Sequence, residues 1–481
     1  MSIVHNRKNI LNCDNWPILL ISLVVTRILS IYSFYLYDDA FISFRYAANL
    51  ANGLGLIYNP GEYVQGITAP LWGLLLALTY KTGIPMEWAA LGWGILFELA
   101  AVGIVVRYLT EELRARAGWF VAVLVALDPY LAKQAVGGME SSLLLAVTVV
   151  AIGLAVRRRF MAAAVSSAIS GFIRPEGLIL CVVLIVVVWL RERRFPLRPF
   201  LTGFVILAAG VAIQYGYYGE LIPASVRGKM VLAGSWESLW ILALFPVRDP
   251  LQCVLTITAF IGLPWAWRES RFIRIYTLWS LTLFLIWIVT GTHLWPWYCV
   301  PFWFWKILIT AILFEVILQK LPQLEKRSKK IPIVTAPLIV AVWITFILAY
   351  GPDRMTANIY HRIRDFAKEH DFSGQTAYGM DFGAFGYYTG LTIRDEPGLV
   401  WPAGRETYRS DMKDILLHEQ PDWAWVTVCC DNARVMHTAP LDTLYKPLWR
   451  ASYFGDTTLA LSLHTGLLWT PDFVLYQRTL P

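Results

Sequence analysis

Long apolar runs alternate with short charged segments along the first 350 residues. The runs are about 15 to 22 residues long and lie at 16–36, 87–106, 117–132, 141–156, 160–173, 176–190, 199–218, 250–267, 272–290, 299–319 and 331–350. Such runs are typical of helices that cross the hydrocarbon core of a bilayer, the shorter ones with little tilt. The pattern predicts an all-α polytopic membrane domain of about 11 transmembrane helices over residues 1–350.

The charged segments between the runs predict the orientation of these helices. Every second segment is basic, and these segments together hold 20 of the 29 Lys and Arg residues before residue 351. Basic loops are retained on the cytoplasmic side of a membrane. The sequence therefore predicts a multi-pass protein of the cytoplasmic membrane with a cytoplasmic N-terminus, an uncleaved first span and extracytoplasmic alternate loops.

Two apolar stretches do not fit this alternation. Counting the stretch from Gly66 to Ile84 as a span would invert every later loop, and the Trp-rich segment 236–247 contains Glu237. Irregular backbone is tolerated at membrane depth where protein buries it. We therefore expect re-entrant or juxtamembrane helices in both places, the first within the first external loop.

The chain changes character after Tyr350. Gly351-Pro352 marks a boundary, and the last 131 residues hold 12 Lys and Arg against 16 Asp and Glu. A helical pattern near 358–370 is followed by short strand-like runs such as Trp423 to Val428. The prediction is a small extracytoplasmic α/β domain over residues 351–481.

Composition excludes several classes of protein. The chain is 57% hydrophobic and 16% charged, which is too apolar for a set of soluble domains. Its basic residues lie in short runs between apolar segments and not on one accessible face, which argues against nucleic-acid binding. The six cysteines show no metal-site spacing, and the sequence contains no convincing Gly-rich phosphate loop, zinc motif or Ser-His-Asp signature.

An acidic pair, Asp38-Asp39, opens the first external loop. Two carboxylates at the end of a span are costly to hold near lipid unless they cap a helix, pair with a cation or act in catalysis. One of them can cap a short amphipathic helix that carries Phe41 and Phe44. Alternatively, a carboxylate here can deprotonate an acceptor hydroxyl as a general base.

Further charged residues fall on the same predicted face. Glu140, in Gly137-Gly138-Met139-Glu140, is either a helix-terminal carboxylate or part of a site. Arg174 in Arg174-Pro175-Glu176 suits a salt bridge and an anion site equally well.

Three external cations could also bind an anion. Arg227 and Lys229 lie on the external side, against the positive-inside tendency, and either bind an anion such as a lipid phosphate or anchor to headgroups. His293 lies among Trp295, Trp297 and Tyr298, which are also typical of an interfacial aromatic belt.

Taken in order, these motifs resemble those of the GT-C superfamily of polyprenyl-phosphate-dependent membrane glycosyltransferases. The similarity is closest to the bacterial branch that includes the mycobacterial terminal arabinofuranosyltransferase. The segments that carry it are DDAFISFRYAANLANGLGLIYNPGEYVQGITAPLW, GGMESSLLLA, IRPEGLIL, GELIPASV, PWYCVPFW and DFGAFGYYTGLTIRDEPGLV.

The resemblance implies an inverting transfer of a sugar, for instance a pentofuranose, from a polyprenyl-phosphate donor to a hydroxyl of a cell-envelope glycan or glycolipid. It implies that Asp38 is the general base, with Asp39 beside it, and that Glu140 is the second acidic motif. External cations would neutralise the leaving phosphate; the candidates are Arg174, Arg227, Lys229 and His293.

Alternatives stay open at this point. The sequence establishes no cofactor and leaves a divalent cation open; if one binds, it would use Asp39 and Glu140. The acceptor could instead be a protein hydroxyl, as in a protein O-glycosyltransferase. A lipid or sugar transporter would need internal repeats with broken helices at the midplane, and no such repeat is evident.

Overall fold

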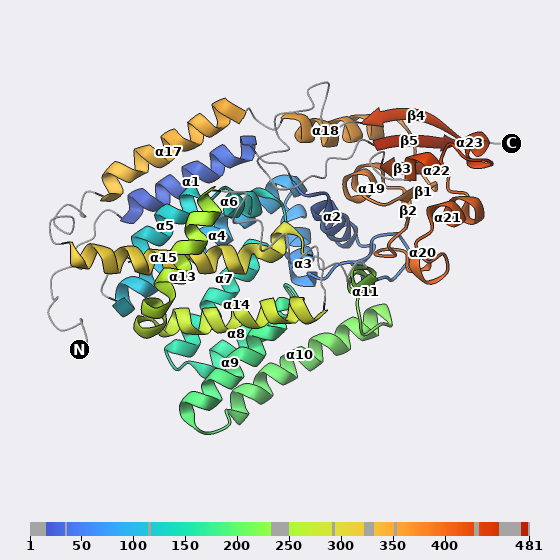
Figure 1. Cartoon of the computed structure of the whole chain (residues 1–481). Helices are drawn as coiled ribbons and strands as arrows, with labels where there is room; N and C mark the ends of the chain where they lie inside the picture. The colour runs from blue at the N-terminus through green and yellow to red at the C-terminus, as the bar shows by residue number, and fades with distance from the viewer. Residues whose placement is uncertain are drawn as a thin grey trace. The chain divides into compact units, whose positions relative to one another are not determined.

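The computed structural model describes residues 16–33, 36–113, 117–231, 250–290, 294–321, 331–350, 354–427, 432–451 and 473–479. Its contacts divide the chain into two compact units, and each is described by itself. Unit 1 comprises residues 1–34, 91–209 and 236–352, and unit 2 comprises residues 35–90, 210–235 and 353–481 (Figure 1).

The first unit is helical throughout its described residues. Its elements, with two helices that continue into unit 2, are α1 (Trp16–Ser33), α4 (Met86–Leu113), α5 (Ala117–Leu127), α6 (Pro129–Val136), α7 (Ser141–Val156), α8 (Phe160–Ser170), α9 (Glu176–Glu192), α10 (Leu197–Tyr218), α13 (Pro250–Glu269), α14 (Arg271–Thr290), η1 (Pro296–Cys299), α15 (Val300–Lys320) and α17 (Ile331–Tyr350). Each of the eleven apolar runs coincides with a helix, except that 117–132 is divided between α5 and α6.

Several of these helices can cross a membrane. By length and composition, five helices among the described residues meet that requirement, and a sixth crossing results if α5 and α6 form one broken span. Others, such as α7 and α8, are apolar but shorter. The helical nature of the runs is thus confirmed, whereas the number of eleven crossings stays a prediction.

Helix α15 lies at the centre of unit 1. It packs against α5, α13 and α14, and nearly all its residues from Val300 to Leu313 are buried. Few of the side chains on α10, by contrast, are buried. An apolar helix whose side chains find no protein neighbours is typical of a surface that faces lipid.

A sharp bend separates α5 from α6 and interrupts the regular hydrogen bonds of the helix backbone. The two helices meet at 72°. Pro129 has no N–H to offer the carbonyl of Val125, and the N–H of Tyr130 bonds to the Asp128 carboxylate at 2.9 Å and not to the helix. Because water is absent at membrane depth, other groups must satisfy the freed carbonyls.

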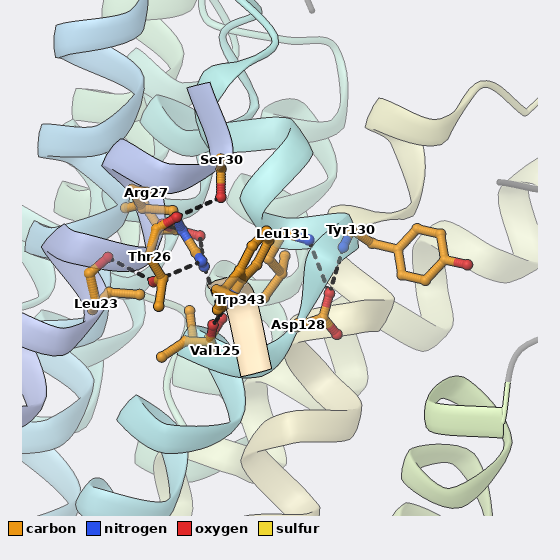
Figure 2. A network of polar contacts seen from close by, with 11 residues as sticks. Leu23, Thr26, Arg27, Ser30, Val125, Asp128, Tyr130, Leu131 and Trp343 are labelled. Carbon is orange, nitrogen blue, oxygen red and sulfur yellow. Dashed lines mark hydrogen bonds and ion pairs between the residues drawn. The ribbon is translucent and has the colours of Figure 1, made fainter. Parts of the chain in front are cut away.

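Side chains of α1 and α17 supply those donors. The Arg27 guanidinium donates to the Val125 carbonyl at 2.7 Å, and the Trp343 indole donates to the Ala126 carbonyl at 2.8 Å (Figure 2). Arg27 also binds Glu98 through two hydrogen bonds of 2.6 and 3.0 Å. For charges within spans, such as Arg27 and Glu98, the sequence predicts internal pairing or snorkelling to the interface. For these two residues the structure shows internal pairing.

The second unit combines helices with one sheet. Its helices are α2 (Asp38–Ala51), α3 (Pro70–Tyr80), α11 (Ala224–Val231), α18 (Arg354–Glu369), α19 (Gly383–Thr389), α20 (Ala403–Glu406), α21 (Met412–Glu419), α22 (Asn432–Val435) and α23 (Leu441–Leu444). Helix α3 lies within the stretch predicted as re-entrant, and α18 confirms the helical pattern near 358–370. The segment 236–247 lies outside the described residues.

The sheet has five strands in the order β2-β1-β3-β5-β4. These strands are β1 (Thr376–Gly379), β2 (Thr392–Asp395), β3 (Trp423–Thr427), β4 (Tyr445–Ala451) and β5 (Phe473–Arg478). Strand β1 pairs in parallel with β2 and β3, and β5 pairs antiparallel with β3 and β4. All described strands thus lie in the C-terminal segment, and β3 confirms the strand predicted at Trp423.

Helix α19 connects the parallel strands β1 and β2. In such a β-α-β unit the helix begins near the carboxyl end of the first strand. The Phe385 ring of α19 stacks on Trp425 of β3 with centroids 4.7 Å apart, which packs the helix onto the sheet. The turn that leads from β1 into α19 is therefore held at the carboxyl edge of β1 and β3.

Candidate functional site

The predicted acidic pair begins helix α2. Asp38 and Asp39 are its first two residues, and Tyr37 occupies the N-cap position without a capping side-chain hydrogen bond. The alternative in which one of the aspartates caps this helix is therefore wrong. Instead, the Asp38 side chain turns to a different helix.

The Asp38 carboxylate receives two backbone hydrogen bonds from the start of α19. The N–H of Gly383 donates to Oδ2 at 2.7 Å, and the N–H of Ala384 donates to Oδ1 at 2.9 Å. The first N–H groups of a helix have no partners within it, so a carboxylate is a favourable acceptor. Both oxygens are engaged, and this fixes the plane of the carboxylate.

Gly383 meets Asp38 at a distance that no other residue permits. A Cβ atom on Gly383 would collide with the main-chain carbonyl of Asp38 and would lie 2.8 Å from its Oδ2 atom. The close approach of α2 and α19 therefore requires glycine at this position.

A third carboxylate, Asp381, lies in the turn between β1 and α19. Its Oδ2 atom accepts a hydrogen bond of 3.4 Å from the Thr427 hydroxyl at the end of β3. Its main-chain carbonyl accepts a hydrogen bond of 2.9 Å from the Trp425 indole. The parallel strands thus hold Asp381 at their carboxyl edge, beside the groups that bind Asp38.

Burial and mutual repulsion make these acids weaker than isolated aspartates. Desolvation, together with the Asp381 and Asp39 charges, raises the pKa of Asp38 from 3.8 to about 7, against the lowering effect of the two backbone N–H groups. Burial, together with the Asp39 charge, raises the pKa of Asp381 to about 6. Such values place proton exchange near neutral pH.

Arg45 holds the far end of α19. It lies seven residues, or about two helical turns, after Asp38 on α2. Its guanidinium donates to the carbonyls of Gly386 and Gly390 at 2.7 and 3.2 Å, and to the Tyr58 carbonyl at 2.9 Å. One face of α2 thus places the negatively charged Asp38 carboxylate at the N-terminal end of α19 and the positively charged Arg45 guanidinium at its C-terminal end. This arrangement complements the helix dipole.

Two other predicted residues, Glu140 and Arg174, meet in unit 1. The Arg174 guanidinium binds Glu140 at 2.6 Å and Glu176 at 2.8 Å, and all three side chains are buried. It also lies over the Tyr298 ring at 4.6 Å. The predicted Arg174–Glu176 salt bridge is therefore present, and Glu140 joins it. A narrow pocket lined by Ser141, Trp279 and Trp297 adjoins these residues.

The structure describes the three remaining predicted cations to different extents. Arg227, on α11, pairs with Glu220 and lies 3.5 Å from Glu406. Lys229 lies on the same helix, but its side chain is outside the described part of the chain. His293 lies outside the described residues altogether.

The two residues left open for a divalent cation are described each within its own unit. Asp39 belongs to unit 2 and Glu140 to unit 1. Within the ranges that the structure describes, no set of three or more His, Cys, Asp or Glu side chains is arranged to hold a metal ion.

The sequence prediction missed Arg45 and Gly383. The Asp38–Arg45 spacing places both residues on one helical face, and that spacing alone could have drawn attention to Arg45. Nothing in the sequence connects Gly383 with Asp38, because the two residues are 345 positions apart. Asp381 appeared in the sequence analysis only as the first residue of DFGAFGYYTGLTIRDEPGLV, one of the segments that carry the resemblance.

Comparison with known proteins agrees with the motifs. No model of a known protein family matches the chain. Among curated proteins, the terminal β-(1→2)-arabinofuranosyltransferase of Mycobacterium tuberculosis (strain ATCC 25618 / H37Rv) is 30% identical over 230 residues, which are 42% of this chain and 36% of that protein. The match thus spans about a third of the length of that curated relative.

Solved structures match over nearly the whole chain. The crystal structure of ArnT from Cupriavidus metallidurans bound to undecaprenyl phosphate superposes with a TM-score of 0.60 at 13% identity, covering 96% of this chain and 98% of that one. The apo structure of the same protein gives a TM-score of 0.59 at 15% identity over the same shares. The chain therefore has the ArnT fold, and its resemblance to the GT-C membrane glycosyltransferases, first indicated by its motifs, is confirmed.

Proposed function

We propose that this protein is an inverting membrane glycosyltransferase that moves a sugar from a polyprenyl-phosphate donor to a hydroxyl acceptor. The observation that carries the proposal is the Asp38 carboxylate, which is oriented by two N–H groups and has a pKa of about 7. A general base is most effective when its pKa lies near the working pH. The ArnT fold, in a protein solved with undecaprenyl phosphate, supports the class of donor.

The reaction follows from these groups. Asp38 removes the proton of the acceptor hydroxyl while the acceptor oxygen attacks the anomeric carbon of the sugar. The bond from that carbon to the phosphate oxygen breaks on the opposite face, so the configuration inverts. Polyprenyl phosphate leaves with one more negative charge than it carried as the diester, and this charge needs a cation nearby.

The cations proposed for the phosphate are Arg174, Arg227, Lys229 and His293. Arg174 and Arg227 each already lie beside two carboxylates, so a phosphate bound by either would have to compete with one of them. Glu140 takes the part of the second acidic motif in the proposal, and Arg174 holds it in place.

The finer assignments are also proposals. The similarity to an arabinofuranosyltransferase supports a pentofuranose donor and an envelope glycan or glycolipid as acceptor. We further propose that residues 1–350 form the membrane domain and residues 351–481 an extracytoplasmic domain, so that transfer occurs on the outer face of a bacterial cytoplasmic membrane.

The decisive experiment compares Asp38→Asn and Asp39→Asn with the parent protein in nanodiscs. Each protein is offered decaprenyl- or undecaprenyl-phosphate sugars and a hydroxyl acceptor, and turnover is measured together with undecaprenyl phosphate binding. Removal of a general base lowers turnover by about 10²- to 10⁴-fold, so we expect this loss for Asp38→Asn with lipid binding retained. Asp442→Asn, an exposed change in the same unit, is the control.

Other outcomes separate the alternatives. Full turnover in both variants would remove the acidic pair from the mechanism. Transfer to peptide hydroxyls but not to glycans would favour a protein O-glycosyltransferase. Movement of lipid-linked sugar across reconstituted vesicles without any transfer, unaffected by either substitution, would indicate a transporter.

A further inference from the structure

The groups that orient Asp38 come from the C-terminal part of the chain. Two backbone amides at the start of α19 bind its two carboxylate oxygens. The turn that carries them is in turn fixed to the sheet, because the Trp425 indole and the Thr427 hydroxyl both bond to Asp381. Contacts with the sheet thereby restrain the turn whose amides bind Asp38 at the start of α2.

The coupling is secured at both ends of α19. Arg45 binds the carbonyls of Gly386 and Gly390, and its guanidinium lies 4.3 Å from the centre of the Tyr58 ring. With Asp38 at one end and Arg45 at the other, α19 cannot slide along α2 without breaking four hydrogen bonds. The two amides therefore stay aimed at the carboxylate.

Gly383 is the position at which the close packing of α2 against α19 leaves no room for a side chain. Its lack of a side chain allows the main chains of α2 and α19 to approach until the amide reaches Oδ2. A methyl group there would push the two helices apart, and the carboxylate would lose its orientation even though no charged group had changed.

We propose that Gly383 and Ala384 are positioning residues for the Asp38 base, so that the turn after β1 is part of the catalytic apparatus and not only of a separate accessory domain. The inference rests on the proposed function, since it assigns to the two amides the task of holding the base of that reaction. It adds that the C-terminal segment is required for the chemical step and not only for binding acceptor.

The amides also predict a direction for the pH dependence. Hydrogen bonds from Gly383 and Ala384 stabilise the ionised form of Asp38 and lower its pKa, whereas the Asp39 and Asp381 charges raise it. Tyr58 is a further titratable group that interacts electrostatically with Asp38. Loss of an amide donor should therefore raise the pKa of Asp38 and move the acid limb of the turnover profile to higher pH.

Two variants test the inference in different ways. Gly383→Ala adds the methyl group, and Ala384→Pro removes one N–H without adding a side chain at 383; proline is accepted in the first turn of a helix. We expect kcat to fall about 100-fold in Gly383→Ala, the effect of displacing a reacting group by about 1 Å, with KM for the donor and undecaprenyl phosphate binding unchanged. The acid limb should move to higher pH in both variants.

Gly216→Ala is the matched control, because a Cβ at that position of α10 meets nothing within 4 Å. The melting temperature of each variant is measured first. If Gly383→Ala does not fold, Ala384→Pro serves as the test of the positioning role. Parent kcat and an unshifted acid limb in folded Gly383→Ala and Ala384→Pro, alongside an inactive Asp38→Asn, would overturn the positioning role but leave the base intact. An active Asp38→Asn would instead refute the proposed base itself.

Discussion

At the scale of single residues, three aspartates share one small region. Asp38 and Asp39 are adjacent on α2, and Asp381 follows β1. Because like charges repel, the charges of Asp39 and Asp381 oppose the ionisation of Asp38 and raise its pKa. The pKa of the proposed base, Asp38, therefore depends on the charges of its neighbours as well as on its own burial.

Asp381 gives a direct test of this electrostatic coupling. Its charge raises the pKa of Asp38, and a base works only when ionised, so turnover should fall as the pH drops through about 7. Asp381→Asn removes the charge but keeps an oxygen for Thr427. We expect the acid limb to move to lower pH, the opposite of the shift expected for Gly383→Ala.

The measurement is kcat against pH for the parent and Asp381→Asn under saturating donor. Asp442→Asn again controls for a general change in surface charge. An acid limb that stays in place, or moves upward, would show that Asp381 does not act on the base through its charge.

At the scale of helices, the break between α5 and α6 explains a buried ion pair in unit 1. Arg27 donates to the Val125 carbonyl, which Pro129 deprives of its regular helical donor and which also accepts from the Asp128 N–H at 3.2 Å. Glu98 compensates the charge that Arg27 brings into the protein interior. Arg27 and Glu98 thus each have a polar partner in the protein interior. Buried charges in membrane proteins are usually paired in this way.

Arg27→Met should therefore destabilise the protein strongly. It leaves Glu98 buried without its partner, and breaking a buried pair in this way typically costs about 3–5 kcal/mol. We expect a clearly lower melting temperature in detergent, largely recovered in the Arg27→Met/Glu98→Met double variant. Arg107→Met, which breaks an exposed ion pair of α4, should change little. Equal effects of the two single variants would refute this account.

At the scale of the whole molecule, the alternation of basic loops with loops that hold few basic residues predicts which segments face each side of the membrane. Arg194 follows α9 in a predicted cytoplasmic loop, and Ser373 follows α18 in the predicted extracytoplasmic domain. Both side chains are exposed within their own units. Their accessibility can therefore report orientation.

The test places single cysteines in a variant whose six native cysteines are replaced by serine. A membrane-impermeant maleimide should label Ser373→Cys in intact spheroplasts and Arg194→Cys only after permeabilisation. Labelling of both before permeabilisation, or the reverse order, would contradict the predicted topology and with it the outer-face reaction.

The sequence by itself determined the properties that depend on neighbouring residues. Apolar length and local patterning predicted the helices of unit 1, the helix at α18 and the strand at β3, because these properties act over a few turns of chain. The motif around Asp38 and Asp39, together with five further segments, indicated the resemblance to the GT-C glycosyltransferases.

Only the tertiary structure decided what those residues contact. The amides of Gly383 and Ala384, the Thr427 hydroxyl and the Asp381 carboxylate reach the region of Asp38 through the parallel pairing of β1 with β2 and β3. Contacts across more than 300 residues leave no periodic signal in the chain. Packing likewise decided that Glu140, 34 positions before Arg174, joins the Arg174–Glu176 salt bridge that the motif predicted.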